Sequence, residues 1–376
     1  MKAVGLVTEY NPFHNGHHHH LKRAQEITGA DCVVAVMSGN FVQRGEPAIL
    51  DKWHRANEAL KSGVNLVIEL PVAMAVQPAN LFAGGALSLL KALGIHDVVF
   101  GAEHPEWDYP ALVAAEKGFQ KAGFAKFNAT YATQFNAQLK AQTGHVLTAP
   151  NDILAFGYFK ENLHRHLGLT LHPIKRRGGA YHDDQLTGTL SSGTAIRDAV
   201  TKGKDFTTAV PAQTAMDLRK VRHVPMAADL YPLLRNQLIQ QPVDWLAKIY
   251  SMSEGLEYRL KEAAEQHLDF AGYLKAAKTK RYTYAHLLRV GFYTTMAASQ
   301  SQVAAAVNHP YLRVLAFDPI GQAYLHQIKK QVSLPLITRV SADLRDGQLN
   351  LDYRAGKLYQ AFTTDEQDVT RAPVRR

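Results

Sequence analysis

The chain of 376 residues contains a single cysteine, Cys32, which lies inside a short apolar run. One thiol excludes an intramolecular disulfide and a cysteine-rich zinc site, and it fits a reducing cytoplasm, where we expect the protein to be located. The apolar neighbours of Cys32 indicate a structural thiol rather than a nucleophile or a metal ligand.

The sequence also lacks an uninterrupted apolar segment of membrane-spanning length. The longest candidate, Val72 to Leu93, is broken by Gln77, Pro78, Asn80 and Lys91, so it does not read as a membrane span. The chain begins directly with a strand-like run, so we expect no signal peptide and no membrane association. A P-loop is absent too, because no G-x-x-x-x-G-K-[ST] occurs.

The net charge is unevenly distributed along the chain, because Lys and Arg are more frequent in the second half. Residues 1–200 carry a net charge of about +1, whereas residues 201–376 carry nearly all of the formal +9. A basic region of this size suggests a polyanionic partner, with RNA the leading candidate. The alternative is a soluble region that is merely basic.

Apolar runs and helical patterns alternate along the first 110 residues. Strand-like runs cover 3–7, 32–37, 66–70 and 97–100, and helical patterns cover 17–28, 51–62 and 80–93. This order predicts an α/β fold with a parallel sheet covered on both faces, followed by a helix at 150–163 and a strand at 170–175. From about residue 205 the patterns become mostly helical. We therefore predict two domains, 1–205 and 206–376.

The turn between the first strand and the first helix contains an H-x-G-H motif, formed by His14, Asn15, Gly16 and His17. A helix N-terminus offers unpaired N–H groups and a positive dipole end, which together favour anions. Gly16 permits close approach of a phosphate, and both histidines can donate hydrogen bonds to it. The alternatives are a surface turn or a metal site within residues 17–20, although adjacent helical residues point in different directions.

Two further clusters suit anions. Lys175, Arg176 and Arg177 precede Gly178 and Gly179, directly after the predicted strand at 170–175. Ser191, Ser192 and Thr194 open a helix that carries Arg197 one turn later, which forms a second anion cradle. The alternatives are a solvated loop for the arginines and an ordinary helix cap for the hydroxyls.

Four longer segments resemble those of one bacterial enzyme family: Glu9–His17, Met37–Ala48, Phe100–Glu103 and Lys278–Thr283. On these segments the chain resembles the tRNA(Met) cytidine acetate ligases, members of the H-x-G-H nucleotidylyltransferase superfamily with a Rossmann-like catalytic domain. The resemblance implies an enzyme that uses ATP, with Mg²⁺, to activate acetate as acetyladenylate. It further implies transfer of the acetyl group to the wobble cytidine of elongator tRNA(Met), which gives N4-acetylcytidine.

The same resemblance implies which residues contact ATP. They are Val7, Thr8, Glu9, Tyr10, Asn11, Pro12, Phe13, His14, Asn15, Gly16, His17, His18, His19, His20, Gly101, Asn151, Asp152, Arg176, Arg177, Ser192, Thr194 and Arg197. Asp152 departs from the family, which commonly has Asn there. Because an ionised Asp only accepts hydrogen bonds and repels phosphate, we expect it near the adenine or the ribose.

Electrostatic stabilisation is the main requirement for attack of a carboxylate on a phosphate, and the candidates for it are His14, His17, Arg176, Arg177 and Arg197. We predict His14, His17 and Arg44 as catalytic residues. Arg44 and Gln43 are suited to orient acetate or the tRNA base, or else form a structural loop. No acidic cluster at metal-ligand spacing is evident, so we expect Mg²⁺ to be held by the phosphates and water.

Cations and aromatics interleave in a basic segment of the second half, which we predict to contact tRNA. The residues are Lys278, Lys280, Arg281, Tyr282 and Arg289. The alternative is a solvated helix start. For the whole chain, the nearest alternative function is a small-molecule adenylyltransferase that makes a cofactor, and a more distant one is an RNA-binding protein without catalysis.

Overall fold

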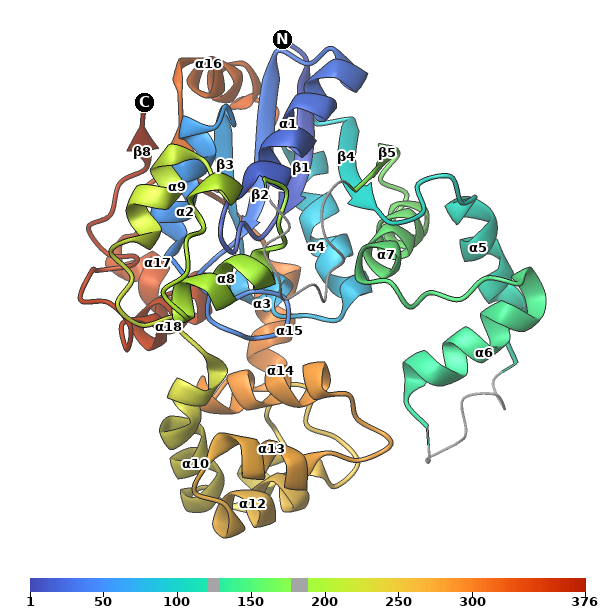
Figure 1. Ribbon diagram of the computed structural model, residues 1–376, viewed down its shortest axis with the longest axis vertical. Coiled ribbons are helices and arrows are strands. Elements are labelled where there is room, and N and C mark those ends of the chain that lie inside the picture. The colour runs from blue at the N-terminus through green and yellow to red at the C-terminus, as the bar shows by residue number, and fades with distance from the viewer. Residues whose placement is uncertain (121–128, 177–188) are drawn as a thin grey trace.

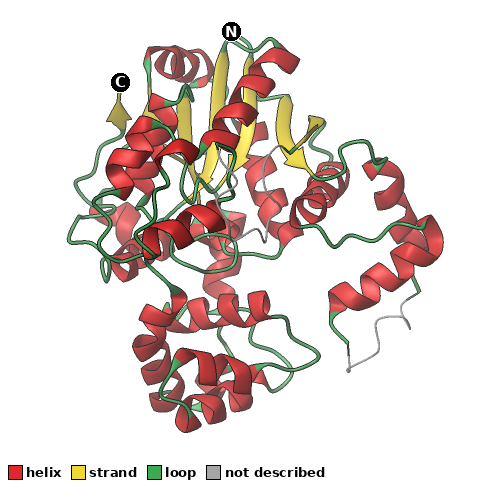
Figure 2. Ribbon diagram, viewed as in Figure 1, coloured by secondary structure: helices red, strands yellow, loops and turns green. Residues whose placement is uncertain are grey.

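The computed structural model describes residues 1–120, 129–176 and 189–376. The described residues form one eight-stranded sheet in the order β5-β4-β1-β2-β3-β6-β7, with β8 paired to β6. Helices lie on both faces of this sheet, and a group of helices extends below it in Figures 1 and 2. The predicted α/β class with a parallel sheet is confirmed.

The parallel part of the sheet consists of β1 (Ala3–Thr8), β2 (Cys32–Ser38), β3 (Leu66–Leu70), β4 (Asp97–Ala102) and β5 (Thr170–Lys175). Strands β2 and β3 are buried at every residue. Such continuous apolar runs are typical of parallel strands with both faces covered. The thiol of Cys32 is buried in β2, as predicted.

Alternate strand residues face two different helical layers. On one face, Val33 and Ala35 pack with residues of α1 (Asn15–Thr28) and α2 (Lys52–Lys61). On the other face, Val34 and Val36 pack with α4 (Ala79–Ala92), α7 (Pro150–His164) and α16 (Pro319–Ile328). The two-residue period of the strands therefore divides the core into two layers.

The remaining elements of the first half are α3 (Val72–Ala75), α5 (Tyr109–Ala115), η1 (Glu116–Gly118), α6 (Tyr131–Thr143) and α8 (Gly193–Thr201). Between residues 205 and 310 the chain is helical, as predicted: η3 (Thr207–Ala209), α9 (Ala212–Leu218), η4 (Ala227–Leu230), α10 (Tyr231–Gln240), α11 (Val243–Leu246), α12 (Leu256–Gln266), α13 (Phe270–Ala277), α14 (Tyr284–Thr295) and α15 (Gln300–Asn308). None of the described helices combines the length and apolar character needed to cross a membrane.

The chain then returns to the sheet. β6 (Leu312–Phe317) pairs antiparallel with β3, and β7 (Leu336–Ile337) and β8 (Val374–Arg375) pair with β6. Two helices, α17 (Ala342–Asp346) and α18 (Asn350–Tyr359), lie between β7 and β8. The sheet therefore takes strands from both sides of residue 205, and the division into two domains stays a prediction.

The strand order reverses at β1, with β2 and β3 on one side and β4 and β5 on the other. In open parallel sheets, ligands bind at the carboxyl ends of the strands where the order reverses. The ends of β1 and β4 are therefore where a ligand site is expected.

Candidate active site

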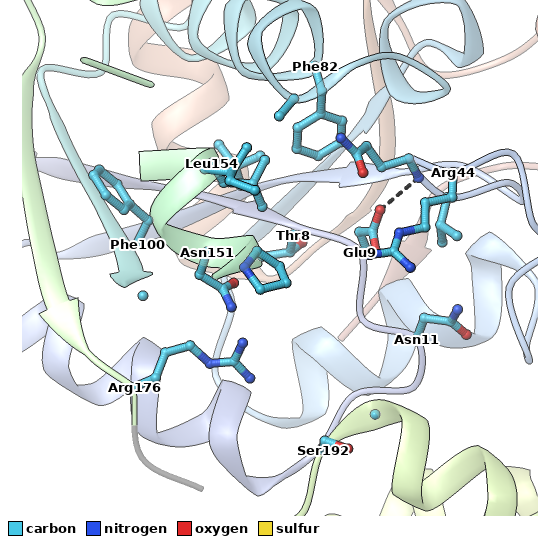
Figure 3. Close-up of a pocket in the computed structure, with 18 of the residues that line it drawn as sticks. Thr8, Glu9, Asn11, Arg44, Phe82, Phe100, Asn151, Leu154, Arg176 and Ser192 are labelled. Carbon is cyan, nitrogen blue, oxygen red and sulfur yellow. Dashed lines mark hydrogen bonds between the residues drawn. The ribbon is translucent and has the colours of Figure 1, made fainter. Parts of the chain in front are cut away.

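A cavity of about 630 Å³ lies at this edge of the sheet. Its walls come from the ends of β1, β4 and β5, from the loops after β1, β2 and β5, and from the starts of α1, α4, α7, α8 and α14 (Figure 3). The volume lies within the range of small-molecule and cofactor sites. The residues at the end of β1 and after it that line the cavity are Val7, Thr8, Glu9, Tyr10, Asn11, His14, Gly16, His17, His19 and His20.

The side chains of His14 and His17 hydrogen-bond to the backbone of the first turn of α1 and stack on each other. The Nδ1 atom of His14 accepts a hydrogen bond from the backbone N–H of Gly16 at 3.1 Å, and the Nδ1 atom of His17 accepts one from the backbone N–H of His14 at 3.3 Å. The two rings are stacked with their centroids 3.8 Å apart. Because both Nδ1 atoms accept, each neutral ring carries its proton on Nε2. Each Nε2–H remains available as a donor to a ligand.

Burial holds both rings in this neutral form. It lowers the pKa of His14 to about 3, and the charges of Arg176 and Arg197 act in the same direction. Burial also holds the pKa of His17 well below its usual value, with His14 adding to the effect. Nearby, the Nε2–H of His20 donates to the carbonyl of Val99 at 2.9 Å, and burial lowers the pKa of His20 to about 4.

The start of α8 is fixed to the turn after β1. Arg197 donates to the carbonyl of Asn11 at 2.6 Å and to the hydroxyl of Thr194 at 3.2 Å. Gly193 lies so close that a Cβ there would sit 2.9 Å from the same carbonyl, which explains the glycine between the two hydroxyl residues. Ser192 caps α8 by accepting from the N–H of Ala195 at 3.1 Å. The first turns of α1 and α8 therefore meet at one cavity.

Arg176 enters the cavity from the end of β5 (Figure 3). It passes over Gly101, where a Cβ would lie 2.9 Å from the Cγ of Arg176. Its guanidinium is 3.8 Å from the carboxylate of Glu103, which also accepts a hydrogen bond from the Asn151 side chain at 2.7 Å. Glu103 thus orients two of the residues predicted to contact ATP.

The expected place of Asp152 beside the adenine or the ribose stays a prediction, and the structure shows other partners for its carboxylate. Asp152 is buried and is not among the described residues that line the cavity. One of its oxygens accepts from the N–H groups of Glu103 and His104, both at 2.9 Å, and from the Tyr109 hydroxyl at 2.9 Å. The other lies 2.6 Å from Nδ1 of His104. Asp152 therefore holds the loop after β4, behind the ligand space.

Other residues predicted to contact ATP also lie outside the cavity wall. They are Pro12, Phe13, Asn15 and His18, whereas Arg177 falls outside the described residues. Phe13 is fully buried in the core. The Asn15 side chain donates to the carbonyls of Thr189 and Thr208, at 3.0 and 2.9 Å, so it ties α1 to the segment around α8.

The predicted RNA-binding residues separate into two groups. Lys278, Lys280, Arg281 and Tyr282 lie outside the cavity wall, just before α14. Arg281 pairs with Glu254 at 3.1 Å, and the Tyr282 hydroxyl donates to the carbonyl of Ser253 at 3.1 Å. Arg289 instead lines the cavity, as does Arg44 from the loop after β2. The helical region therefore contributes directly to the site.

The sequence reasoning missed Arg55 on α2, which is fully buried. Its guanidinium donates to the carbonyls of Glu9, at 2.6 Å, and Ser38, at 3.1 Å, and to that of Gly39. It thereby joins the chain ends that leave β1 and β2. A signal was present, because Lys52, Arg55, Ala56 and Ala59 follow the spacing of one buried helix face.

Comparison with known proteins gives a consistent result. Residues 1–372 match the model of a family described as HIGH Nucleotidyl Transferase. The chain is 58% identical to a tRNA(Met) cytidine acetate ligase of Limosilactobacillus reuteri and 60% identical to one of Limosilactobacillus fermentum; each alignment covers 100% of this chain, and 99% and 100% of the relative.

Two solved structures of Thermotoga maritima TmcAL share the fold at 30% identity over 100% of this chain. The apo form matches with a TM-score of 0.90 over 99% of its chain, and the form bound with alpha-thio ATP matches with 0.86 over 100%. The chain therefore belongs to the HIGH nucleotidyl transferases and, within them, to the tRNA(Met) cytidine acetate ligases.

Proposed function

We propose that the protein is an ATP-dependent ligase that activates acetate as acetyladenylate and transfers the acetyl group to the wobble cytidine of elongator tRNA(Met). The observation that carries this proposal is the cavity at the ends of β1 and β4, where His14 and His17 offer Nε2–H donors beside Arg176. The family, and a 30% identical structure bound with alpha-thio ATP, support ATP as the ligand.

The residues of the cavity suit the activation step. A carboxylate oxygen of acetate forms a bond to the α-phosphorus of ATP, the bond between the α-phosphorus and the bridging oxygen breaks, and pyrophosphate leaves. His14, His17 and Arg176 then stabilise the negative charge without changing protonation state, which is how a preorganised site lowers the barrier. The first turns of α1 and α8 add their N–H groups and dipoles.

Magnesium fits this site only as a companion of ATP. Within the described residues, no group of three or more His, Cys, Asp or Glu side chains is placed to hold a metal ion. The described carboxylates that line the cavity are Glu9 and Glu46. The phosphates and water would supply most ligands of Mg²⁺, which would neutralise phosphate charge.

The transfer step needs no covalent enzyme intermediate. The N4 amine of cytidine forms a bond to the acetyl carbon, the carbon–oxygen bond to phosphate breaks, and AMP leaves while the amine loses a proton. The only cysteine of the chain, Cys32, lies in β2, and burial raises its pKa to about 12. A thiol so disfavoured as thiolate is a poor nucleophile.

The helical region is suited to present the tRNA. Thr283, Ala285 and Arg289 of α14 and its cap line the cavity, and Lys278 and Lys280 lie just before them in the chain. We propose that residues 206–376 position the anticodon loop while residues 1–205 hold ATP, with α14 completing the reaction site.

The first prediction separates this function from a small-molecule adenylyltransferase, which would use the same ATP site. Incubation with ATP and labelled acetate should give labelled acetyladenylate, because acetate attacks the α-phosphate directly. Adding elongator tRNA(Met) should then move the label to one cytidine and release AMP. Chromatography of nuclease digests measures the product.

Initiator tRNA is the control for that experiment and should stay unlabelled. Label retained by the denatured protein would contradict the adenylate route. Label that never reaches tRNA, with pyrophosphate exchange supported by another small substrate, would favour the adenylyltransferase.

A further inference from the structure

Two arginines face the same side of the cavity from different parts of the chain. Arg44 lies in the loop after β2, and Arg289 lies on α14. In the sheet order, β1 and β4 separate β2 from β5, the strand whose end carries Arg176. Figure 3 accordingly shows Arg44 with Glu9 on one side of the site and Arg176 with Asn151 on the other. The cavity therefore has a second cationic end, away from Arg176.

Close backbone packing sets the two arginines beside each other. Gly45 has a φ of +84°, and a Cβ on it would lie 3.3 Å from the Cα of Arg289 and 3.2 Å from the carbonyl oxygen of Leu288. The rings of Phe41 and Phe292 pack with centroids 4.7 Å apart. Glycine is needed at Gly45 for both its conformation and this approach. The loop of Arg44 is thereby pressed onto α14 at the level of Arg289.

Among the described residues, no carboxylate forms an ion pair with Arg289. The side chain of Arg289 is partly buried. Burial lowers its pKa to about 10, and the charge of Arg44 acts in the same direction. Other groups near it are the hydroxyls of Tyr250 and Tyr293 and the imidazole of His286. Two cations held together in a partly buried wall repel each other unless an anion lies between them.

Glu9, one of the two described carboxylates that line the cavity, accepts a hydrogen bond from the loop that carries Arg44. Its Oε1 atom accepts the N–H of Gln43 at 2.8 Å (Figure 3), and burial raises the pKa of Glu9. Glu9 therefore orients the residues that precede Arg44. Apolar side chains complete this end of the cavity: Val42, Pro78, Ala79 and Phe82. Two guanidinium groups beside a small apolar wall match a short carboxylate, since guanidinium binds carboxylate oxygens in pairs.

We propose that Arg44 and Arg289 bind the carboxylate of acetate, with its methyl group against the apolar wall. This inference rests on the proposed function and assigns the acid-binding end of the same cavity. It also gives α14 a part in the activation step, before any tRNA is involved. A phosphate of ATP or of tRNA is the competing anion, and the experiment distinguishes the three.

The test uses ATP–pyrophosphate exchange without tRNA, measured over a range of acetate concentrations. Arg44→Ala and Arg289→Ala should each raise the KM for acetate about 30-fold or more, as expected for truncating one partner of a buried charge pair. The KM for ATP should stay within about twofold of the wild type. Added guanidinium should partly restore Arg289→Ala, because it replaces the missing cation. Arg345→Ala, which removes a partly exposed arginine of α17 outside the cavity wall, should leave both KM values unchanged.

Three results would overturn the assignment: an unchanged KM for acetate in both variants, a rise in the KM for ATP instead, or a loss confined to transfer onto tRNA. If Arg289→Ala does not fold, Arg44→Ala and Arg289→Lys carry the same measurement. Absence of acetate-dependent exchange in the wild-type protein would refute the proposed function itself. Wild-type exchange that both variants leave intact would refute only the assignment of the two arginines.

Discussion

At the scale of single residues, the H-x-G-H motif predicted two histidines beside a ligand but not their state. The structure adds that His14 and His17 each use Nδ1 to accept a backbone N–H, so both must donate through Nε2. This arrangement depends on the path of the turn, including Tyr10 at a φ of +48°. Residue types alone do not reveal such backbone geometry.

Asp152 illustrates a second limit at the residue scale. Its carboxylate suggested a contact with the adenine or the ribose, yet it accepts from two backbone N–H groups of the loop after β4. A sequence does not show which acceptors the backbone itself will need. Asn151 and Arg176 are also expected to contact ATP, and both line the cavity.

The second prediction separates the two nitrogen atoms of His17. In His17→Asn the amide oxygen can replace Nδ1 as the acceptor for the N–H of His14, but nothing replaces the Nε2–H. We expect normal thermal unfolding and a loss of acetate-dependent ATP–pyrophosphate exchange on the order of 100-fold, the usual cost of removing one such donor.

His17→Gln is the matched variant, because its longer amide can place an N–H donor at the position of Nε2. It should keep more exchange activity than His17→Asn and should unfold near the wild-type temperature, because Gln at the third helical position can also accept the N–H of His14. Near-normal exchange in a folded His17→Asn protein would show that the motif is structural.

At the scale of elements, short-range pattern predicted the parallel strands well. The expected runs at 32–37, 66–70 and 170–175 agree with β2, β3 and β5 to within one residue at each end. Hydrophobic continuity and intervening helices are local signals, and both are strong here. The pairing of β6 with β3 joins residues about 250 positions apart. Local patterns contain no information about such pairing, so the return of the chain to the sheet was not predicted.

Buried charges connect these distant elements. Lys52 of α2 lies 2.8 Å from Glu69 of β3 and 2.7 Å from Asp368, and Arg313 of β6 pairs with both carboxylates. All four side chains are at most 3% exposed. The cluster balances two positive and two negative charges, so each charge is compensated only while the C-terminal segment stays in place.

The third prediction concerns this cluster. Lys52→Met should lower the free energy of unfolding by about 3–5 kcal/mol, because it leaves an uncompensated negative charge in the core. Urea unfolding followed by circular dichroism measures the change. The double variant Lys52→Met/Glu69→Gln restores the charge balance and should be more stable than Lys52→Met alone. A loss below 1 kcal/mol in the single variant would show that water or local rearrangement solvates the cluster.

At the scale of the whole molecule, the basic second half of the chain contributes helices to two ends of the arrangement in Figure 1. The helices α10, α12, α13 and α14 gather at one end, and α16 lies at the opposite end of the sheet. The basic excess of residues 201–376 suggested an RNA surface, but charge alone did not indicate which residues enter the cavity. Because α14 packs against the loop after β2, Arg289 lines the cavity and Lys280 does not.

The final prediction tests whether this end of the molecule contacts tRNA. Lys280 is exposed, and Lys278 is partly exposed over the ring of Tyr284, whereas Arg281 is already paired with Glu254. Lys278→Ala/Lys280→Ala should therefore weaken tRNA binding and reduce the slope of log affinity against log salt by about one to two, because fewer counterions are released. Filter binding at several salt concentrations measures both quantities.

The matched control for that double variant is Lys329→Ala/Lys330→Ala, which removes two exposed lysines at the end of α16 and changes the net charge equally. It should leave the salt slope near that of the wild type, because α16 lies far from α14 in Figure 1. Both variants should keep acetate-dependent ATP–pyrophosphate exchange, since neither pair lines the cavity. Equal slopes for the two variants would mean that tRNA binding depends on total charge rather than on this surface. The basic segment before α14 would then not be part of the RNA site.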